Sequence, residues 1–368
     1  MTEKDLLYTL ALQKASKIGD ITAKKLIQHC GSPEEIFKEK AAVLQSINGI
    51  GSYLTKSIKG ASILIDAEKE LNYLEKNNIK HWYFQEEAYP NRLKNCIDGP
   101  ILLFHSGTIN LKQQKIISIV GTRNITNYGK ILCEQIIEEL SILNPIIVSG
   151  FAYGTDITAH KSAIKNNIQT IGCLAHGLNQ IYPKVHKKYI HEVEKNGGFV
   201  TEFWSTSNPD RENFIKRNRV IAGLSEATLV IESAEKGGSL ITADIANSYN
   251  REVFATPGRP EDKLSIGTNN LIKLQRAQLI TSAADIIYML NWETKHSAVK
   301  PIQPQLFIEL NETEETIVSF LKGKDKVDLD TIAISCQLPI YSISSTLLNL
   351  ELKGIIRPHP GKQFEYIG

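Results

Sequence analysis

The turn Gly121-Thr122-Arg123 directly follows the β-branched run IISIV and precedes a helical pattern that contains Gly129. Backbone N–H groups at the start of a helix attract an anion, and a guanidinium beside them can grip a phosphate through two parallel hydrogen bonds. The alternative is that Arg123 pairs with a carboxylate of the protein. The glycines are not spaced as GxGxxG, and the next β-branched run ends in Ser149-Gly150 instead of an acidic residue. The fingerprint of a nicotinamide dinucleotide site is therefore absent.

A second glycine turn, SGFAYGTD, comes after the next β-branched run. Gly150 and Gly154 flank a short aromatic segment in which Tyr153 could stack on a nucleobase. Phe151 in the same segment could also stack, but we favour a core position for it, because aromatic residues in such loops are commonly buried. Thr155 or Asp156 is expected to cap the following helix, and for Asp156 we favour capping over catalysis. His160 on that helix is expected to form structural hydrogen bonds instead of acting as a general base.

A third segment, FIKRNR, concentrates cations just before a buried strand. Residues 160–220 hold ten Lys and Arg against five Asp and Glu, a local charge of +5 against +2 for the whole chain. A charge run is usually a solvated surface, but this one alternates with apolar residues and adjoins several glycine turns, which favours phosphate binding. The candidate residues of this segment are Phe214, Lys216, Arg217, Asn218 and Arg219.

A fourth turn, Gly237-Gly238-Ser239, opens another helical pattern and forms a further potential anion cradle. By contrast, the chain carries no GxxxxGK[ST] loop, no GxSxG elbow, no HExxH motif and no carboxylate cluster suited to Mg²⁺. Several anion sites without a catalytic set predict a binding protein that uses no metal and no cofactor.

Composition limits the alternatives further. The chain has 368 residues, 42% of them hydrophobic and 22% charged, which suggests two or three globular domains at about 100–200 residues each. Since 42 basic residues nearly balance 40 acidic ones, affinity for a polyanion must come from local clustering. Five widely separated cysteines favour a reducing cytoplasm, and no apolar run approaches the roughly 18 residues of a membrane helix.

The elements that must position these turns fall into distinct regions. Residues 1–80 show helical periodicity. Within them, Gly49-Ile50-Gly51 is the form of a helix-hairpin-helix, in which close glycines could admit a phosphate, or a simple helix corner with a buried Ile50. In residues 81–290, short β-branched runs alternate with helical stretches. This alternation of strand and helix patterns predicts an extended Rossmann-like α/β domain with a parallel sheet, whose strands carry the glycine turns at their carboxyl ends.

The remaining chain reads as a linker and a third domain. Residues 291–308 contain prolines and no periodicity, as expected of a linker. Residues 309–368 have the helix, helix-turn-helix and hairpin order of a winged helix. The region from residue 305 onward carries a net charge of −3, which is unfavourable for gripping a duplex. We therefore expect the winged helix to contact a protein or to regulate.

Together the motifs GTRNITNYG, SGFAYGTD, FIKRNR and GGSLITA resemble those of the DNA-processing protein A family, also called DprA or Smf. The resemblance covers nearly the whole chain. It implies a cytoplasmic, homodimeric protein that binds single-stranded DNA without reading its sequence and helps to load the RecA recombinase in natural transformation. It implies no catalytic activity. Tyr153 departs from the family pattern, since many members carry a basic residue there, so a phosphate contact could have become a stacking contact.

The competing class is a nucleotide-processing enzyme of the lysine-decarboxylase-like group, the phosphoribohydrolases. These enzymes place a PGGxGT turn before a helix, and GGSLITAD superficially resembles that turn. Asp244 is the only nearby acid, however, and the glutamate that the group sets behind its turn is missing.

Overall fold

The computed structural model describes residues 1–112, 115–292, 310–359 and 363–368. It divides into two compact units, Met1–Thr294 and Lys295–Gly368. No helix of the described ranges is long and apolar enough to span a bilayer.

The first unit begins with six helices that pack around a buried aliphatic core. The helices are α1 (Glu3–Lys14), α2 (Asp20–Cys30), α3 (Pro33–Lys38), α4 (Ala41–Ser46), α5 (Ser52–Ile58) and α6 (Ala61–Lys76). Gly49 lies between α4 and α5 with φ +88°, a conformation that favours glycine, and Ile50 beside it is buried. The predicted helical region is confirmed, and the buried Ile50 agrees with the alternative of a simple helix corner. Phosphate binding at Gly49-Ile50-Gly51 stays a prediction.

A nine-stranded sheet forms the centre of the first unit. Its strands are β1 (Lys80–Tyr83), β2 (Leu102–Gly107), β3 (Ile116–Val120), β4 (Ile146–Ser149), β5 (Thr170–Cys173), β6 (Gly197–Thr201), β7 (Ala227–Val230), β8 (Glu252–Ala255) and β9 (Gln278–Leu279). They are ordered β1-β2-β6-β5-β4-β3-β7-β8-β9. The strands β3 to β9 pair in parallel, as the sequence predicts. The antiparallel β1 and β2 extend the β6 edge and were not predicted.

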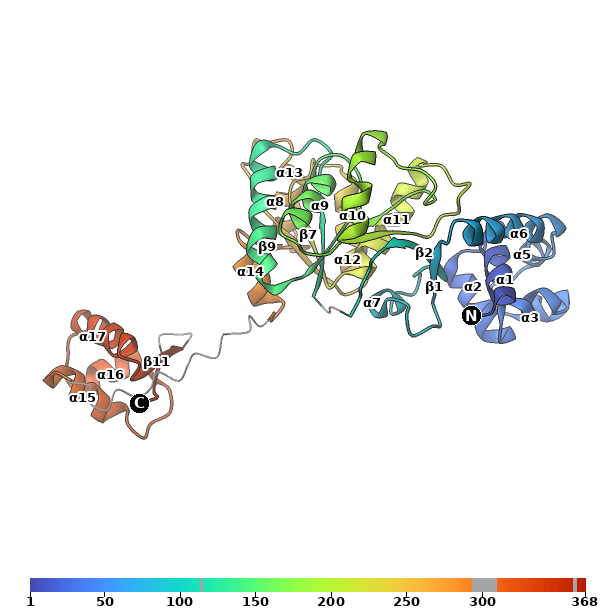
Figure 1. The fold of residues 1–368 in the computed structure, drawn as a ribbon. Coiled ribbons are helices and arrows are strands. Elements are labelled where there is room, and N and C mark those ends of the chain that lie inside the picture. Colours follow the sequence, from blue (N-terminus) through green and yellow to red (C-terminus); the bar gives the residue numbers. More distant parts are fainter. Residues whose placement is uncertain (113–114, 293–309, 360–362) are drawn as a thin grey trace. The chain divides into compact units, whose positions relative to one another are not determined.

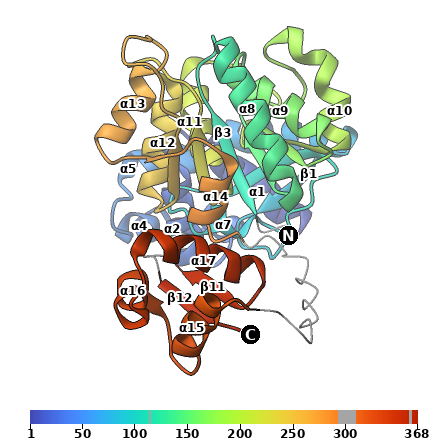
Figure 2. The same ribbon diagram turned by 90° about the vertical axis from the view of Figure 1, so that its left-hand side faces the viewer.

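Helices cover both faces of this sheet (Figures 1 and 2). One face packs against α8 (Asn127–Leu140), α9 (Thr155–Lys165) and α14 (Ala283–Met289), and the other against α7 (Asn91–Lys94), α11 (Arg211–Leu224), α12 (Gly238–Ser248) and α13 (Ile266–Lys273). The strands are apolar on both faces because each is covered on both. Shorter elements, η1 (Ser141–Leu143), η2 (Lys184–Tyr189) and α10 (Ile190–Lys195), complete the unit.

The connections of β3 and β7 create a crevice at the carboxyl edge of the sheet. From β3 the chain proceeds through α8 to its neighbour β4, whereas from β7 it proceeds through α12 to β8 on the other side. Because these two crossovers lead in opposite directions, the loops after β3 and β7 separate. Ligands of open α/β sheets bind at such a switch point.

A buried ion-pair network joins the N-terminal helices to the α/β part. Arg219 Nη2 on α11 lies 2.9 Å from Asp20 Oδ2 at the start of α2 and also bonds Glu202. The other Asp20 oxygen accepts the Ile101 N–H at 2.9 Å. Trp204 Nε1 donates to Gln13 at 3.0 Å, and its ring belongs to the core of the helical region. The helices are thus fixed to the sheet domain by polar and apolar contacts.

We expect the Arg219→Met variant to lose about 3–5 kcal/mol of unfolding free energy, because it removes the guanidinium from Asp20 and leaves the buried Glu202 paired with Lys216 alone. Urea denaturation measures the loss. As a control, Lys130→Met removes an exposed pair with Glu134 and should change the stability by about 1 kcal/mol or less. Equal effects of the two substitutions would show that the Arg219 network does not stabilise the joint.

The second unit is a winged helix, as predicted. Its helices are α15 (Glu312–Leu321), α16 (Leu329–Cys336) and α17 (Ile340–Leu352), and its strands are β10 (Val327–Asp328), β11 (Ile356–His359) and β12 (Gln363–Tyr366). The strands form an antiparallel sheet ordered β10-β12-β11, and the helices enclose a separate aliphatic core. The linker predicted over residues 291–308 falls almost wholly outside the described residues.

Candidate functional site

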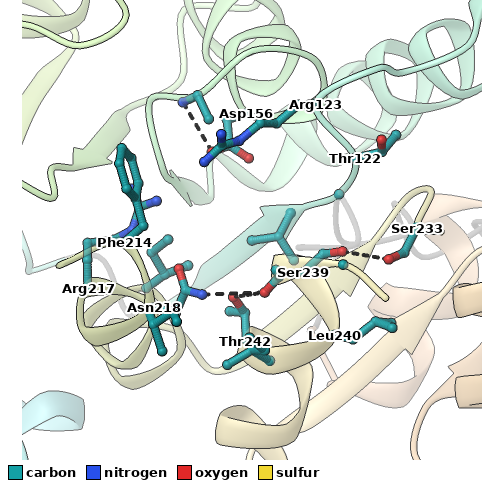
Figure 3. Close-up of a pocket in the computed structure, with 18 of the residues that line it drawn as sticks. Thr122, Arg123, Asp156, Phe214, Arg217, Asn218, Ser233, Ser239, Leu240 and Thr242 are labelled. Atoms are coloured by element: carbon teal, nitrogen blue, oxygen red, sulfur yellow. Dashed lines mark hydrogen bonds between the residues drawn. The ribbon is translucent and has the colours of Figure 1, made fainter. Parts of the chain in front are cut away.

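A cavity of about 870 Å³ opens at the switch point between β3 and β7 (Figure 3). Its walls are the turn after β3, the exposed side of α11 and the turn between β7 and α12. The structure brings most of the predicted site residues together here, namely Gly121, Thr122, Arg123, Phe214, Arg217, Asn218, Gly237, Gly238 and Ser239. The remaining five, Gly150, Tyr153, Gly154, Lys216 and Arg219, do not line it.

The turn after β3 is held to both of its neighbours. Thr122 N–H donates to the Glu232 carbonyl after β7 at 2.7 Å. The Thr122 carbonyl accepts the Thr155 N–H at 3.1 Å and the Thr155 hydroxyl at 3.2 Å from the start of α9. Arg123 extends from this fixed turn and is exposed, with its guanidinium 5.2 Å from the centre of the Phe214 ring. Among the described residues it forms no ion pair, so the predicted alternative of a carboxylate partner is not observed.

Gly150 and Gly154 lie beneath the cavity, where neighbouring groups leave no room for a side chain. Gly154 has φ +73°, and a Cβ there would come within 2.3 Å of the Thr122 carbonyl oxygen. A Cβ on Gly150 would fall 2.2 Å from Asp156 Oδ2 and 2.7 Å from Arg217 Nη1. Both glycines therefore let the β3 turn, α9 and α11 approach one another, and their role in ligand binding stays a prediction.

Arg217 forms the floor of the cavity. Its side chain is buried, Nη1 donates to the Cys173 carbonyl at the end of β5, and the guanidinium lies 5.8 Å from the Phe214 ring centre. Burial lowers the pKa of Arg217, while the nearby Asp156 carboxylate opposes that shift. Its Nε has no hydrogen-bond partner among the described residues. A fixed, buried cation thus lies at the base of the site.

Asp156 differs from its expected role. Gly154, not Asp156, occupies the N-cap position of α9, and Asp156 Oδ2 instead accepts the Ala152 N–H at 3.2 Å. Burial raises the pKa of Asp156, and the positive charge of Arg217 counteracts the rise. The carboxylate therefore serves to balance the buried Arg217 and to fix the loop after β4.

The turn between β7 and α12 forms the opposite wall. Ser239 is buried and its hydroxyl donates to Ser233 Oγ at 2.9 Å, while Asn218 Nδ2 on α11 donates to the Gly238 carbonyl at 3.4 Å. Gly237 is the N-cap of α12 and carries no capping side chain, and Gly237, Gly238 and Ser239 all line the cavity. The two glycine turns consequently face each other across the crevice.

Sequence reasoning missed two exposed cations on the cavity rim. Arg211 is the first residue of α11, and Lys236 immediately precedes the Gly237-Gly238 pair. Their positions in the sequence, next to motifs already identified as candidate anion sites, could have indicated them. With Arg123 they distribute positive charge around the mouth of the cavity.

The predicted cations of FIKRNR do not all lie in the cavity, although the clustering of charge in this segment suggests it. The side chains of a helix diverge by about 100° per residue, so consecutive cations cannot share a face. Only Arg217 reaches the cavity. Lys216 lies 2.8 Å from Glu202 in a separate groove, and Arg219 pairs with Asp20 at the contact with the N-terminal helices.

Tyr153 is half exposed and its ring packs against His186.

The fold and the site together define a class: an open parallel sheet with a cationic cavity at its switch point, followed by a winged helix. A family model described as DNA recombination-mediator protein A matches residues 80–291, and a DprA winged-helix model matches residues 303–362. The chain belongs to the DprA/Smf family.

Individual relatives agree. Protein Smf of Synechocystis is 29% identical over 99% of this chain and its own full length, and Protein Smf of Escherichia coli is 33% identical over 80% of this chain and 79% of its own. The solved structure of DprA from Streptococcus pneumoniae superposes with a TM-score of 0.64 at 28% identity, covering 78% of this chain and 98% of that one. The structure of a Helicobacter pylori DprA is described as giving insight into a single-stranded DNA binding mode. It superposes with a TM-score of 0.52 at 30% identity and covers 58% of this chain and 96% of that one.

His160 supports the site from below, as expected for a structural histidine. Its Nδ1 bonds Thr170 at 2.7 Å and its Nε2 bonds the Gly150 carbonyl, which fixes the loop after β4. Burial lowers the pKa of His160 to about 4.

This histidine should make the fold acid-sensitive. The unfolded chain, with a histidine pKa of about 6.5, binds the proton more readily than the folded one, so stability falls as pH drops below about 6.5 toward 4. Between about pH 7 and about pH 5 we expect a loss of roughly 2 kcal/mol from this group. Urea denaturation at both values should show a correspondingly smaller pH-dependent loss for His160→Gln. An unchanged loss would assign the acid sensitivity to other groups.

Proposed function

We propose that this protein binds single-stranded DNA in the switch-point cavity, without reading base sequence. The observation that carries the proposal is the cavity itself, where the two glycine turns, a buried arginine and three exposed cations surround one aromatic ring. The relative from Helicobacter pylori, whose structure is described as showing a single-stranded DNA binding mode, covers 58% of this chain and supports the proposal.

Each part of the cavity suits a different part of a nucleic acid strand. Backbone N–H groups of the turns and the guanidinium groups of Arg123 and Arg217 are donors for phosphate oxygens. Phe214 offers a ring for stacking, and the guanidinium of Arg123 beside it adds a planar cationic surface. Stacking is sequence-tolerant because every base has a π-face. Sequence preference should therefore be weak.

Replacing Arg123 with Ala should weaken binding to oligo-dT and lower the slope of log K against log salt by about 0.7, the value for one neutralised phosphate of a single strand. Fluorescence anisotropy over a salt series measures both effects. Lys165→Ala is the control, since Lys165 is exposed at the end of α9, before β5 and thus at the opposite edge of the sheet. Identical slopes for the two variants would exclude Arg123 from the interface.

The proposal includes no catalytic step. Of the two acids that line the cavity, Asp156 is engaged with the Ala152 N–H and neighbours Arg217, while Asp244 is exposed and lies 3.4 Å from Arg276. Neither is placed as a free general acid or base. The predicted alternative, a phosphoribohydrolase, would release adenine from AMP, and we expect no release.

We further propose that the protein acts in the cytoplasm during natural transformation and helps to load RecA onto the bound strand. The description of the family as recombination mediators supports this role. The winged helix is a candidate for a protein contact. Its helix α17 has no Lys or Arg along its length, and Leu348 and Leu352 on it are exposed.

A homodimer is part of the proposal, and the β9 edge of the sheet is its candidate interface. Among the strands of the described ranges, β9 pairs with β8 alone, so its second side is an open edge. Leu274, Leu279 and Tyr288 are exposed around it. A second copy placed there would cover these apolar groups and bring two cavities onto one strand.

Leu279→Lys should convert the dimer to monomers, because it places a charge within the apolar contact. Light scattering after gel filtration measures the mass. The control Ile142→Lys alters another exposed residue, at η1, and should leave the mass unchanged. A dimer that persists in Leu279→Lys would place the interface elsewhere.

A further inference from the structure

The segment between β5 and α10 carries charge and aromatic rings that the cavity does not use. From Gly177 to His191 it contains three lysines, two tyrosines and no acidic residue. Its lysines Lys184, Lys187 and Lys188 are exposed, and none forms an ion pair among the described residues. Lys188 lies 5.1 Å from the centre of the Tyr189 ring. This is an unneutralised basic surface interleaved with aromatic groups.

The segment is held in a fixed conformation. Pro183 and His186 are buried, and His186 Nδ1 bonds the Phe151 carbonyl at 3.0 Å. The Tyr182 N–H donates to His176 Nε2 at 3.2 Å, and His176 is itself buried. In the 3₁₀-helix η2, residues three apart eclipse, so Lys184 and Lys187 lie on one line. Both line a groove that also contains Gln180 and Glu194. Glu194 accepts a hydrogen bond from Ser106 at 2.8 Å and is the one acidic residue that lines this groove, against the two lysines.

Two ring contacts connect this segment to the proposed DNA site. The half-exposed Tyr182 lies edge to face with Phe214, with 5.7 Å between ring centres, and Phe214 lines the cavity. Tyr153, after β4, lies edge to face with His186 at 5.1 Å. The sheet order β7-β3-β4-β5 places the carboxyl ends of these strands in succession along one edge. A strand leaving the cavity past Phe214 therefore meets Tyr182 next and then the lysines of η2.

We propose that Tyr182, Lys184 and Lys187 form a second subsite for single-stranded DNA, which extends the path of the strand from the cavity along the sheet edge to η2. The inference rests on the proposed function and adds to it a direction for the strand and a longer binding site. Tyr182 stacks a base beyond Phe214, and the two lysines neutralise the phosphates that follow. A short oligonucleotide fills the cavity alone, whereas a longer one reaches the second subsite.

The test compares oligo-dT of about 4 and about 16 nucleotides, the limits of the site sizes known for single-strand binding folds. For the long oligonucleotide, Lys184→Ala/Lys187→Ala should lower the salt slope by about 1.4, the value for two phosphates. Tyr182→Ala should weaken binding about fivefold or more, and Tyr182→Phe should retain the affinity because it keeps the ring. The variant Lys184→Ala/Lys187→Ala should leave binding of the short oligonucleotide unchanged.

The matched control is Lys165→Ala/Lys195→Ala, which removes two exposed lysines that precede β5 and β6 at the opposite edge. Thermal unfolding checks that each variant is folded. The second subsite is overturned if Lys184→Ala/Lys187→Ala binds the long oligonucleotide as tightly as this control variant does. It is also overturned if Lys184→Ala/Lys187→Ala weakens binding of the short and the long oligonucleotide equally. In either case, weaker binding by Arg123→Ala shows that the proposed function stands. If the unaltered protein binds neither oligonucleotide, both proposals fail.

Discussion

The buried guanidinium of Arg217 is the contact on which the geometry of the site depends. It bonds the carbonyl at the end of β5, neighbours the Asp156 carboxylate of α9 and lies beside the ring of Phe214 on its own helix. The end of β5 and the loop after β4 are thereby fixed to α11 around one charge. A buried charge is costly unless neighbouring groups compensate it, so the glycine at position 150 and the acid at position 156 are required where they stand. The same compensation leaves Nε without a protein partner.

The three consecutive polar residues of the RNR segment form contacts on different sides of helix α11. Arg217 faces the cavity, Asn218 bonds the opposite wall at Gly238, and Arg219 holds the N-terminal helices through Asp20 and Glu202. One turn of α11 therefore links the site to the joint between the helical region and the sheet. Substitutions in this segment affect stability and binding through different contacts, and the two effects need separate measurement.

Much of the architecture is predictable from sequence because it follows from local patterns. All seven parallel strands and the winged helix correspond to β-branched runs and helical periodicities, and the family motifs locate both glycine turns. The antiparallel β1 and β2 escaped prediction because their pairing with β6 is a long-range contact with no local signature. The ion pairs of Lys216 and Arg219 were not predicted for a similar reason, because their acidic partners, Glu202 and Asp20, belong to other segments of the chain. Composition identifies cations, but only the fold decides which are neutralised.

The central claim is that both glycine turns, at residues 121–123 and 237–239, hold the phosphates of one strand. Amide hydrogen–deuterium exchange of the full-length protein, with and without oligo-dT, tests it most directly. The account predicts slower exchange in both turns when the oligonucleotide is bound. Tight binding that leaves the exchange of both turns unchanged would contradict it, because the strand would then lie on another surface of the molecule.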